Sequence, residues 1–494
     1  AQSTADAAPT PSPTPSSQTQ AQAAVSNSAE TLPTTVVTAS RFQEAASTQT
    51  QSVSIITAAD IRQSGARTVA EALHRVLGLP VTLDLAGTGS GGVDLRGYGA
   101  TAWSNQVVIV DNLRMNEGDL SAPQLASIPM DSIERIEVVR GASSVLYGEG
   151  ASAGAIIITT KAGAGVARKT SGSVQVGVGN EGQREVAASG TFASPDGFSM
   201  DVAAQQQNAD NNRQNFATKN GSANINAQWS NDWLRLGGNL GTKSNQAQLP
   251  GPLTAAQYAA NPWQASTPTT NDWGNQSTDQ HGLFAQAQVG DWELAADSNW
   301  RTKAYRSQSS YGAYDFDLNA HNQSLRARHQ YKGDSLSNSF IVGYDSDRWQ
   351  RNILGSFGSS AIAQNTAWYI KDEIHLQSGT QLSAGWRREK AHKTESSSGT
   401  DLNQHANAWD VGIAQSLTTN WSVFARAAKG LRMANVDEFS FTPPNYTLLP
   451  QTSKDVEAGV RWNATGQSVE ARIYRSRVTN EIGYDPNFPN PMSW

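Results

Sequence analysis

The side chains that could take part in chemistry are spread widely along this chain. Histidine, the usual general base and metal ligand, occurs seven times, but never at metal-ligand spacing or beside a nucleophile. Cysteine is absent, which excludes thiol catalysis and disulfide bonds. The sequence therefore predicts a protein that is not an enzyme and carries no cofactor or metal ion. The histidines are His74, His281, His321, His329, His375, His392 and His405.

The composition argues against both a helical membrane protein and a typical soluble enzyme. Charged residues make up 16% of the 494 residues and hydrophobic residues 38%, and mean hydropathy is -0.48. No segment approaches the roughly 20 continuous apolar residues of a membrane-spanning helix. A membrane-spanning strand needs only about 9–11 residues with one apolar face, so a barrel remains possible. The net charge of -6 gives no support for a nucleic-acid partner.

The N-terminal segment differs from the rest of the chain. Residues 1–30 contain Pro, Ser, Gln and Ala with almost no large apolar side chain, which predicts a disordered tether. The first residues, Ala1 and Gln2, are typical of an exported protein after signal cleavage. We therefore expect a mature, exported chain that starts with a flexible arm.

A compact α+β unit is predicted from about residue 53 to residue 161. Two helices are expected at 57–63 and 68–77, each preceded by a threonine cap, and the second is stopped by a glycine and a proline. Short apolar runs predict buried strands at 107–112, 133–141 and 155–160. Such a unit has enough apolar residues to fold around a core of its own.

Beyond about residue 167 the chain becomes a series of alternating segments separated by Gly- and Asn-rich turns. About 15 segments of this kind follow one another. Long antiparallel strands with one polar and one apolar face suit a barrel with a wet lumen. A soluble solenoid or sandwich would also alternate, but no repeat of fixed length is present. The polar stretch 246–280, which contains Trp263 and Trp273, is predicted to be a long external loop.

Four local segments give the chain a specific resemblance to TonB-dependent outer-membrane receptors. The longest match runs through IERIEVVRGASSVLYG and continues into AIIITT. The segment LPTTVVTA is similar to the TonB box, a short extended stretch that pairs with the energy-coupling protein TonB. The segments are residues 32–39, 93–99, 133–160 and 429–460.

The resemblance implies a transmembrane antiparallel β-barrel, of 22 strands in the family, with an N-terminal α+β plug domain in its lumen. The implied divisions are a periplasmic tether at 1–30, a TonB box segment at 31–41, a plug at 42–165 and a barrel at 166–494. The TonB box would comprise Thr35, Val36, Val37, Thr38 and Ala39.

The resemblance also implies charged contacts between the plug and the barrel. Arg96 and Arg140 would face wall carboxylates that include Glu457, and would hold the plug as a latch. The alternative is that Glu457 only faces lumen water. Glycines at 97, 141, 148 and 154 are expected to allow tight turns in the confined lumen.

The number of predicted strands is lower than the family's. Because only about 15 are found, we predict that the chain is a C-terminally truncated version of a longer receptor. Its last ten residues, 485–494, contain three prolines and are not expected to pair as a closing strand.

The implied function is energised uptake of a scarce metal chelate across a Gram-negative outer membrane, with a ferric siderophore as first choice. Cobalamin and haem are alternatives within the family, although no histidine lies between residues 432 and 449, where haem receptors often place one. A surface adhesin or a passive pore is the alternative from another class. A signal-transducing receptor would need a further folded N-terminal domain, for which the 30-residue tether is too short and too polar.

Ligand contacts are expected at the apex of the plug. Trp103, Asn105, Arg114 and Asn116 flank predicted strand ends, and aromatic, Arg and Asn side chains suit planar anionic chelates. The expected partners are TonB, the chelate, and outer-membrane lipid and lipopolysaccharide, with no nucleic acid. We expect a monomer.

Overall fold

A computed structural model gives the fold of this chain, and every described residue belongs to the compact unit from Thr35 to Trp494. The described residues are 36–37, 41–42, 44–45, 50–82, 92–125, 128–164, 169–310, 312–356, 358–443, 446–465, 467–483 and 492–493.

The two predicted helices are present and are capped as expected. The first, α1 (Ala58–Ser64), begins at Thr57, whose hydroxyl and backbone form a capping box with Asp60. The second, α2 (Val69–Leu77), begins at Thr68 and ends at Gly78, which has the left-handed conformation that favours glycine. Local sequence signals therefore fix both helices.

A five-stranded sheet forms the centre of the plug, the name used here for residues 50–164. Its order is β3-β8-β9-β6-β7, with β6 and β9 parallel and the other pairs antiparallel. The three predicted strands appear as β6, β8 and β9. One buried core joins α2 to apolar side chains of these strands, namely Val108, Ile133, Ile136, Val138, Ile156 and Ile158. The strands are β3 (Val53–Thr57), β6 (Gln106–Val110), β7 (Leu113–Arg114), β8 (Ile133–Arg140) and β9 (Gly154–Thr160).

Short elements complete the plug. They are β4 (Val81–Thr82), β5 (Gly92–Val93), η2 (Gly99–Ser104), η4 (Met130–Ser132) and α3 (Ser144–Tyr147). Glycine is required where β9 begins, because Gly154 has φ +139° and a Cβ there would lie 2.0 Å from the Val139 carbonyl oxygen. Gly141 has φ +89°, and a Cβ there would lie 3.0 Å from the Arg96 guanidinium.

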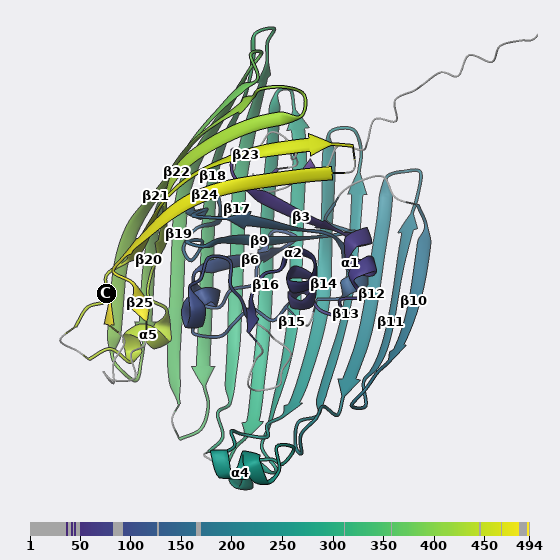
Figure 1. The fold of residues 1–494 in the computed structure, drawn as a ribbon, viewed down its shortest axis with the longest axis vertical. Helices are drawn as coiled ribbons and strands as arrows, with labels where there is room; N and C mark the ends of the chain where they lie inside the picture. Colours follow the sequence, from purple (N-terminus) through teal and green to yellow (C-terminus); the bar gives the residue numbers. More distant parts are fainter. Residues whose placement is uncertain are drawn as a thin grey trace, which may run out of the picture. The chain divides into compact units, whose positions relative to one another are not determined.

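A single antiparallel sheet of 15 strands, here called the wall, follows the plug. Each strand pairs with the next along the chain, and the sheet curves around the plug (Figure 1). The strands are β10 (Ser171–Val178), β11 (Arg184–Ala193), β12 (Phe198–Ala209), β13 (Thr218–Ser230), β14 (Leu234–Gln248), β15 (Trp273–Val289), β16 (Trp292–Gln308), β17 (Phe316–Lys332), β18 (Leu336–Ile353), β19 (Ser359–Leu376), β20 (Thr380–Glu395), β21 (Thr400–Ser416), β22 (Trp421–Arg432), β23 (Gln451–Ala464) and β24 (Gln467–Thr479). The expected antiparallel barrel wall with an N-terminal plug is confirmed.

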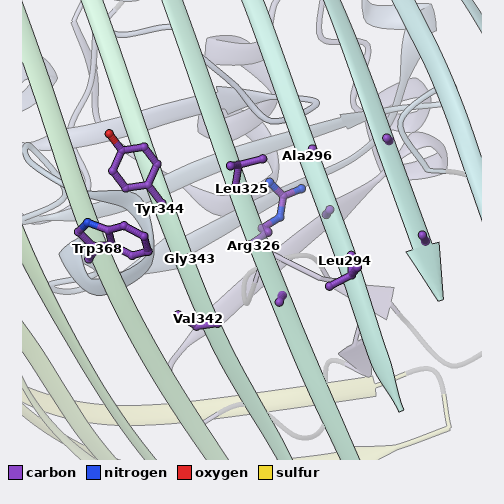
Figure 2. Close-up of a pocket in the computed structure, with 12 residues that line it drawn as sticks. Leu294, Ala296, Leu325, Arg326, Val342, Gly343, Tyr344 and Trp368 are labelled. Carbon is purple, nitrogen blue, oxygen red and sulfur yellow. The ribbon is translucent and has the colours of Figure 1, made fainter. Parts of the chain in front are cut away.

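The two faces of the wall differ as the alternation predicts. Outward residues such as Val174 keep most of their surface exposed, at 76%, whereas inward residues such as Arg387 are buried against the plug. The outer face carries an open apolar groove of about 470 Å³. Leu325, Gly343 and Trp368 are among the residues that line it (Figure 2). An apolar outer face of this kind is suited to lipid chains.

The strands β10 and β24 are the two edges of the wall, and they do not pair with each other. Near the C-terminus, β26 (Met492–Ser493) pairs with β25 (Ile482–Gly483) in a separate ladder rather than with the wall. Within the described part of the chain, no helix has the length and apolar character needed to cross a membrane.

The predicted loop at 246–280 is shorter than expected. Strand β14 continues to Gln248 and β15 begins at Trp273, so only 249–272, with α4 (Ala255–Ala260) and η5 (Thr267–Thr269), connects them. The prediction was wrong at both ends because these strand ends are polar, and their backbone pairing does not depend on apolar side chains. A second connection carries α5 (Val436–Ser440), between β22 and β23.

Candidate functional site at the plug–wall interface

Glu117 follows β7 and places a carboxylate against the wall. It accepts hydrogen bonds from Arg301 Nη2 at 2.8 Å and Trp349 Nε1 at 3.0 Å, and it also pairs with Lys303. Burial alone would raise the pKa of Glu117, but the positive charges of Arg301 and Lys303 outweigh it and lower the pKa. One plug carboxylate therefore neutralises two wall cations.

Asp119 lies two residues further on and joins the plug to the α5 connection through one arginine. Arg351 of β18 donates to Asp119 Oδ2 at 2.8 Å and to Asp437 Oδ1 at 2.6 Å. The backbone N–H of Leu120 also donates to Asp437, at 3.2 Å. Burial and the nearby negative charge of Glu117 raise the pKa of Asp119. The two plug carboxylates are therefore held in different electrostatic environments.

Glu149 forms a third charged contact, with β19 and β20. Its carboxylate lies 3.2 Å from Lys393 Nζ and accepts a hydrogen bond from Asn365 Nδ2 at 2.8 Å. Burial raises the pKa of Glu149, but the charges of Lys393 and Arg114 outweigh this effect and lower it. The carboxylate is therefore ionised and fixed to the wall.

Arg41 and Phe42 anchor the segment before the plug. Arg41 Nη1 lies 2.9 Å from both carboxylate oxygens of Asp345 on β18 and 3.1 Å from the Leu146 carbonyl oxygen. Phe42 is 4% exposed, and the Arg328 guanidinium lies 4.6 Å from its ring centroid. Arg41 is the last residue of the predicted TonB box segment, and it lies in the interface between plug and wall.

The predicted latch residues fall into two separate environments. Arg96 Nη2 donates to Glu457 Oε2 at 2.8 Å, and both side chains are at most 4% exposed. The Arg96 guanidinium also lies 3.9 Å from the ring centroid of Tyr474. Its Nε and Nη1 atoms are buried without a hydrogen-bond partner. The structure thus brings Arg96 and Glu457 together in an incompletely satisfied pair.

Arg140 does not share this contact with Glu457. It donates to the Ser54 hydroxyl, and burial together with the positive charge of Arg472 lowers the pKa of Arg140 to about 10. The wall carboxylate that acts on it is Glu470 rather than Glu457. Arg140 thus lies near a wall carboxylate of β24, and its role in a latch stays a prediction.

The four predicted ligand residues lie within the plug. Asn116 donates to the Trp103 and Gln106 carbonyl oxygens and accepts from the Val108 N–H. Arg114 donates to the carbonyl oxygens of residues 147 and 149, and Asn105 contacts Gln451 of β23 at 2.7 Å. The indole N–H of Trp103 is buried without a partner. These contacts favour a structural role, and ligand contact by these four residues stays a prediction.

Only part of the predicted TonB box lies within the described residues. Val36 and Val37 form β1 (Val36–Val37), which pairs antiparallel with β2 (Glu44–Ala45). Thr35, Thr38 and Ala39 lie outside the described residues. The pairing shows that this segment adopts the extended backbone that strand addition requires.

Comparison with protein families matches two models in the order seen in the fold. Residues 45–155 match the TonB-dependent receptor plug domain, and residues 203–493 match the TonB-dependent receptor-like β-barrel, which is more than half of the chain. The chain belongs to the TonB-dependent receptor family. Members of this family are transporters of the Gram-negative outer membrane, so the receptor is an outer-membrane protein and not an enzyme.

The receptor is similar to curated transporters over different spans. The vitamin B12 transporter BtuB of Vibrio cholerae serotype O1 is 34% identical over 178 residues, which cover 36% of this chain and 28% of that protein. BtuB of Vibrio vulnificus strain YJ016 is 23% identical over 481 residues, or 94% of this chain and 73% of that protein. The unliganded ferric citrate transporter FecA shares the fold with a TM-score of 0.76 and 17% identity, over 88% of this chain and 71% of FecA.

Proposed function

We propose that the receptor imports a bulky metal chelate in a TonB-dependent manner. The observation that carries this proposal is a folded plug that is fixed to the inner face of the wall by buried ion pairs and is preceded by a short extended segment, β1. A passive pore has no need of a plug held in this way. A plug that is preceded by a segment able to pair by strand addition suits a channel that opens when a partner protein pulls on that segment.

Pairing with TonB would require β1 to leave β2. Their ladder joins only two residue pairs, Val36 with Ala45 and Val37 with Glu44. A ladder this short is weak, because it offers few hydrogen bonds to offset the entropy of ordering both segments. The same main-chain groups would then be available to an edge strand of TonB.

Two ligand classes compete for the site. The resemblance to the family as a whole favours a ferric siderophore. The sequence relatives named above are vitamin B12 transporters, and one of them aligns over 94% of this chain, which favours cobalamin as the first ligand to test. The likeness to FecA is at 17% identity and supports the fold alone.

A binding and uptake panel tests the proposal. The receptor in detergent would be titrated with cobalamin, ferric citrate, a ferric hydroxamate, a ferric catecholate and haem, and uptake would be measured in cells with and without TonB. We expect saturable binding of one ligand and uptake of that ligand only when TonB is present. Equal uptake without TonB would support the passive pore instead, and binding without any uptake would support the adhesin.

We further propose that Arg96 and Glu457 act as a latch. Replacing either residue by Gln removes the nearest partner of the other buried charge; the next cation beside Glu457 is Arg426, at 4.0 Å. Each single variant should therefore lower the stability of the docked plug by about 3–5 kcal/mol and release the plug at a lower urea concentration. The docked plug of the double variant should be no less stable than that of the less stable single variant, because the two residues share one interaction. Protease sensitivity of the plug, with the wall still folded, gives the readout.

Arg140 provides a matched control for this latch. Since its neighbours include the cations Arg472 and Arg96, Arg140→Gln should change the urea midpoint far less than Arg96→Gln. Equal effects of the two substitutions, or additive effects of the Arg96 and Glu457 substitutions, would contradict the latch.

A further inference from the structure

Positive charge is gathered on one part of the outer face of the wall, on β20 and on β22 to β24, which lie in the green to yellow part of Figure 1. The cations alternate along their strands with buried, inward residues, and they form no ion pair with a residue of the described ranges. We call these residues the cationic patch: Arg388 and Lys390 on β20, Lys429 on β22, Lys454 on β23, and Arg475 and Arg477 on β24.

Three of these cations face one another across neighbouring strands. The register places Lys429 directly opposite Lys454, and Lys454 directly opposite Arg477. Side chains that lie directly opposite in an antiparallel pair have Cβ atoms about 4.5–5.5 Å apart, so like charges there destabilise the pairing. An anion bound between the three cations would remove this repulsion.

The carboxylates of the same strands lie on the inner face of the wall and cannot neutralise the patch. Those of β22 to β24 are Asp455, Glu457 and Glu470. Each of them accepts a hydrogen bond from the plug, at residues 142, 96 and 52 in that order. The counter-charge for the cationic patch must therefore come from another molecule.

The patch borders an apolar part of the outer face. Lys429 lies opposite Trp409, and Trp409 lies opposite Trp386. Beside the cations, Val456 is 61% exposed and Ile473 is 78% exposed. Tryptophan is enriched where the apolar band of a barrel meets the polar region of the membrane. A molecule bound to the patch would therefore meet apolar side chains as well as positive charges.

The patch lies at the end of the wall that carries the longer connections. Lys429 and Lys454 flank the connection 433–450, which contains α5. At the other end of the same strands the connections are short, at 417–420 and 465–466. Outer-membrane barrels have short periplasmic turns and longer extracellular loops, so the patch belongs to the extracellular side of the apolar band.

We propose that the cationic patch binds a lipid of the outer leaflet whose headgroup carries more than one phosphate, such as lipopolysaccharide. Cations spread over neighbouring strands match several phosphates of one headgroup, and each pair gains from charge-assisted hydrogen bonds. The adjacent apolar side chains match the acyl chains of the same molecule. A free phosphate would use the cations alone. This site does not depend on which chelate the receptor imports.

Binding of lipid A, a phosphorylated lipid, tests the site in the whole receptor. Binding would be measured by native mass spectrometry in an uncharged detergent. The patch variant combines Lys429→Gln, Lys454→Gln and Arg477→Gln. The control variant removes the same charge from exposed cations of β11, β13 and β18 that have no Lys or Arg directly opposite, through Arg184→Gln, Lys219→Gln and Arg348→Gln.

We expect the unmodified receptor and the control variant to bind lipid A with saturation, and the patch variant to bind it roughly 100-fold more weakly. The reason is that each cation beside an anionic lipid surface contributes about a factor of five to the affinity. Arg388→Gln combined with Lys390→Gln, on β20, should weaken binding roughly 25-fold by the same reasoning. Lipid A without its phosphates should bind the unmodified receptor and the patch variant equally.

Three results would overturn the proposal. The first is equal binding of lipid A by the patch and control variants. The second is binding of inorganic pyrophosphate as tightly as lipid A, which would indicate a site for free anions. The third is unfolding of the lipid-free patch variant at a lower temperature than the unmodified receptor. The substitutions remove like-charge repulsion, so the lipid-free patch variant should be at least as stable.

Discussion

We expect the Val37→Pro variant to bind its ligand normally and to import none of it. Val37 lies in β1, and its backbone is the part of this segment that would pair with TonB. Proline removes the backbone N–H and fixes φ, so it breaks a strand-addition interface that depends on main-chain hydrogen bonds. Uptake should fall to the level of cells without TonB, whereas the dissociation constant should stay within about twofold.

Val37→Thr is the matched control for this prediction. Threonine keeps the N–H and favours extended backbone, so uptake should stay close to that of the unmodified receptor. Unchanged uptake by Val37→Pro would contradict the assignment of this segment as the TonB box and would favour a passive pore. Loss of ligand binding in Val37→Pro would show instead that the substitution disturbs the plug.

The second large effect is expected at Glu117. Replacement by Gln removes the carboxylate that pairs with both Arg301 and Lys303, for which no other carboxylate partner exists among the described residues. Two buried cations would remain uncompensated, which costs about 3–5 kcal/mol by analogy with other buried pairs. The urea concentration at which the plug becomes protease-sensitive should fall accordingly.

Asp119 offers a control two residues away. Its pKa is raised, so its charged form is already disfavoured, and Arg351 keeps Asp437 as a partner. Asp119→Asn should therefore change the stability of the plug by about 1 kcal/mol at most. A larger loss for Asp119→Asn than for Glu117→Gln would contradict this account of the interface.

The lowered pKa of Glu117 also predicts a pH dependence. Its stabilising effect is fully present above the ordinary pKa of a glutamate, about 4.3, and is lost as the pH falls through its lower pKa in the folded receptor. The urea midpoint of the unmodified plug should therefore fall as the pH is lowered from about 5 toward 3. Glu117→Gln should flatten this dependence of the urea midpoint on pH. The same pH profile in the variant would contradict the assignment of the dependence to Glu117.

The local elements could be predicted because their signals lie within a few residues of one another. Thr57 and Asp60 cap α1 from three residues apart, and the period-two alternation beyond residue 167 yields 15 wall strands in the order of the chain. The polar strand ends at 246–248 of β14 and 274–280 of β15 were not predicted, because backbone pairing extends beyond the apolar pattern.

The candidate site could be predicted only in part. The resemblance pointed to Arg96 and Glu457, which are 361 positions apart and lie in contact. It did not point to Glu117, Asp119 or Glu149, whose only local signal is the presence of carboxylates in a glycine-rich plug. Their partners lie on distant strands, and spacing along the sequence does not predict such pairs.

The sequence by itself determined the elements of this protein: the capped helices, the apolar plug strands and the alternating wall segments, since each depends on neighbouring side chains. Only the tertiary structure decided which wall strands hold the plug by ion pairs, because that depends on which strands of the curved wall come to face each plug carboxylate. Electrostatic attraction acts through space, so the buried ion pairs between plug and wall exist only once the sheet has curved around the plug.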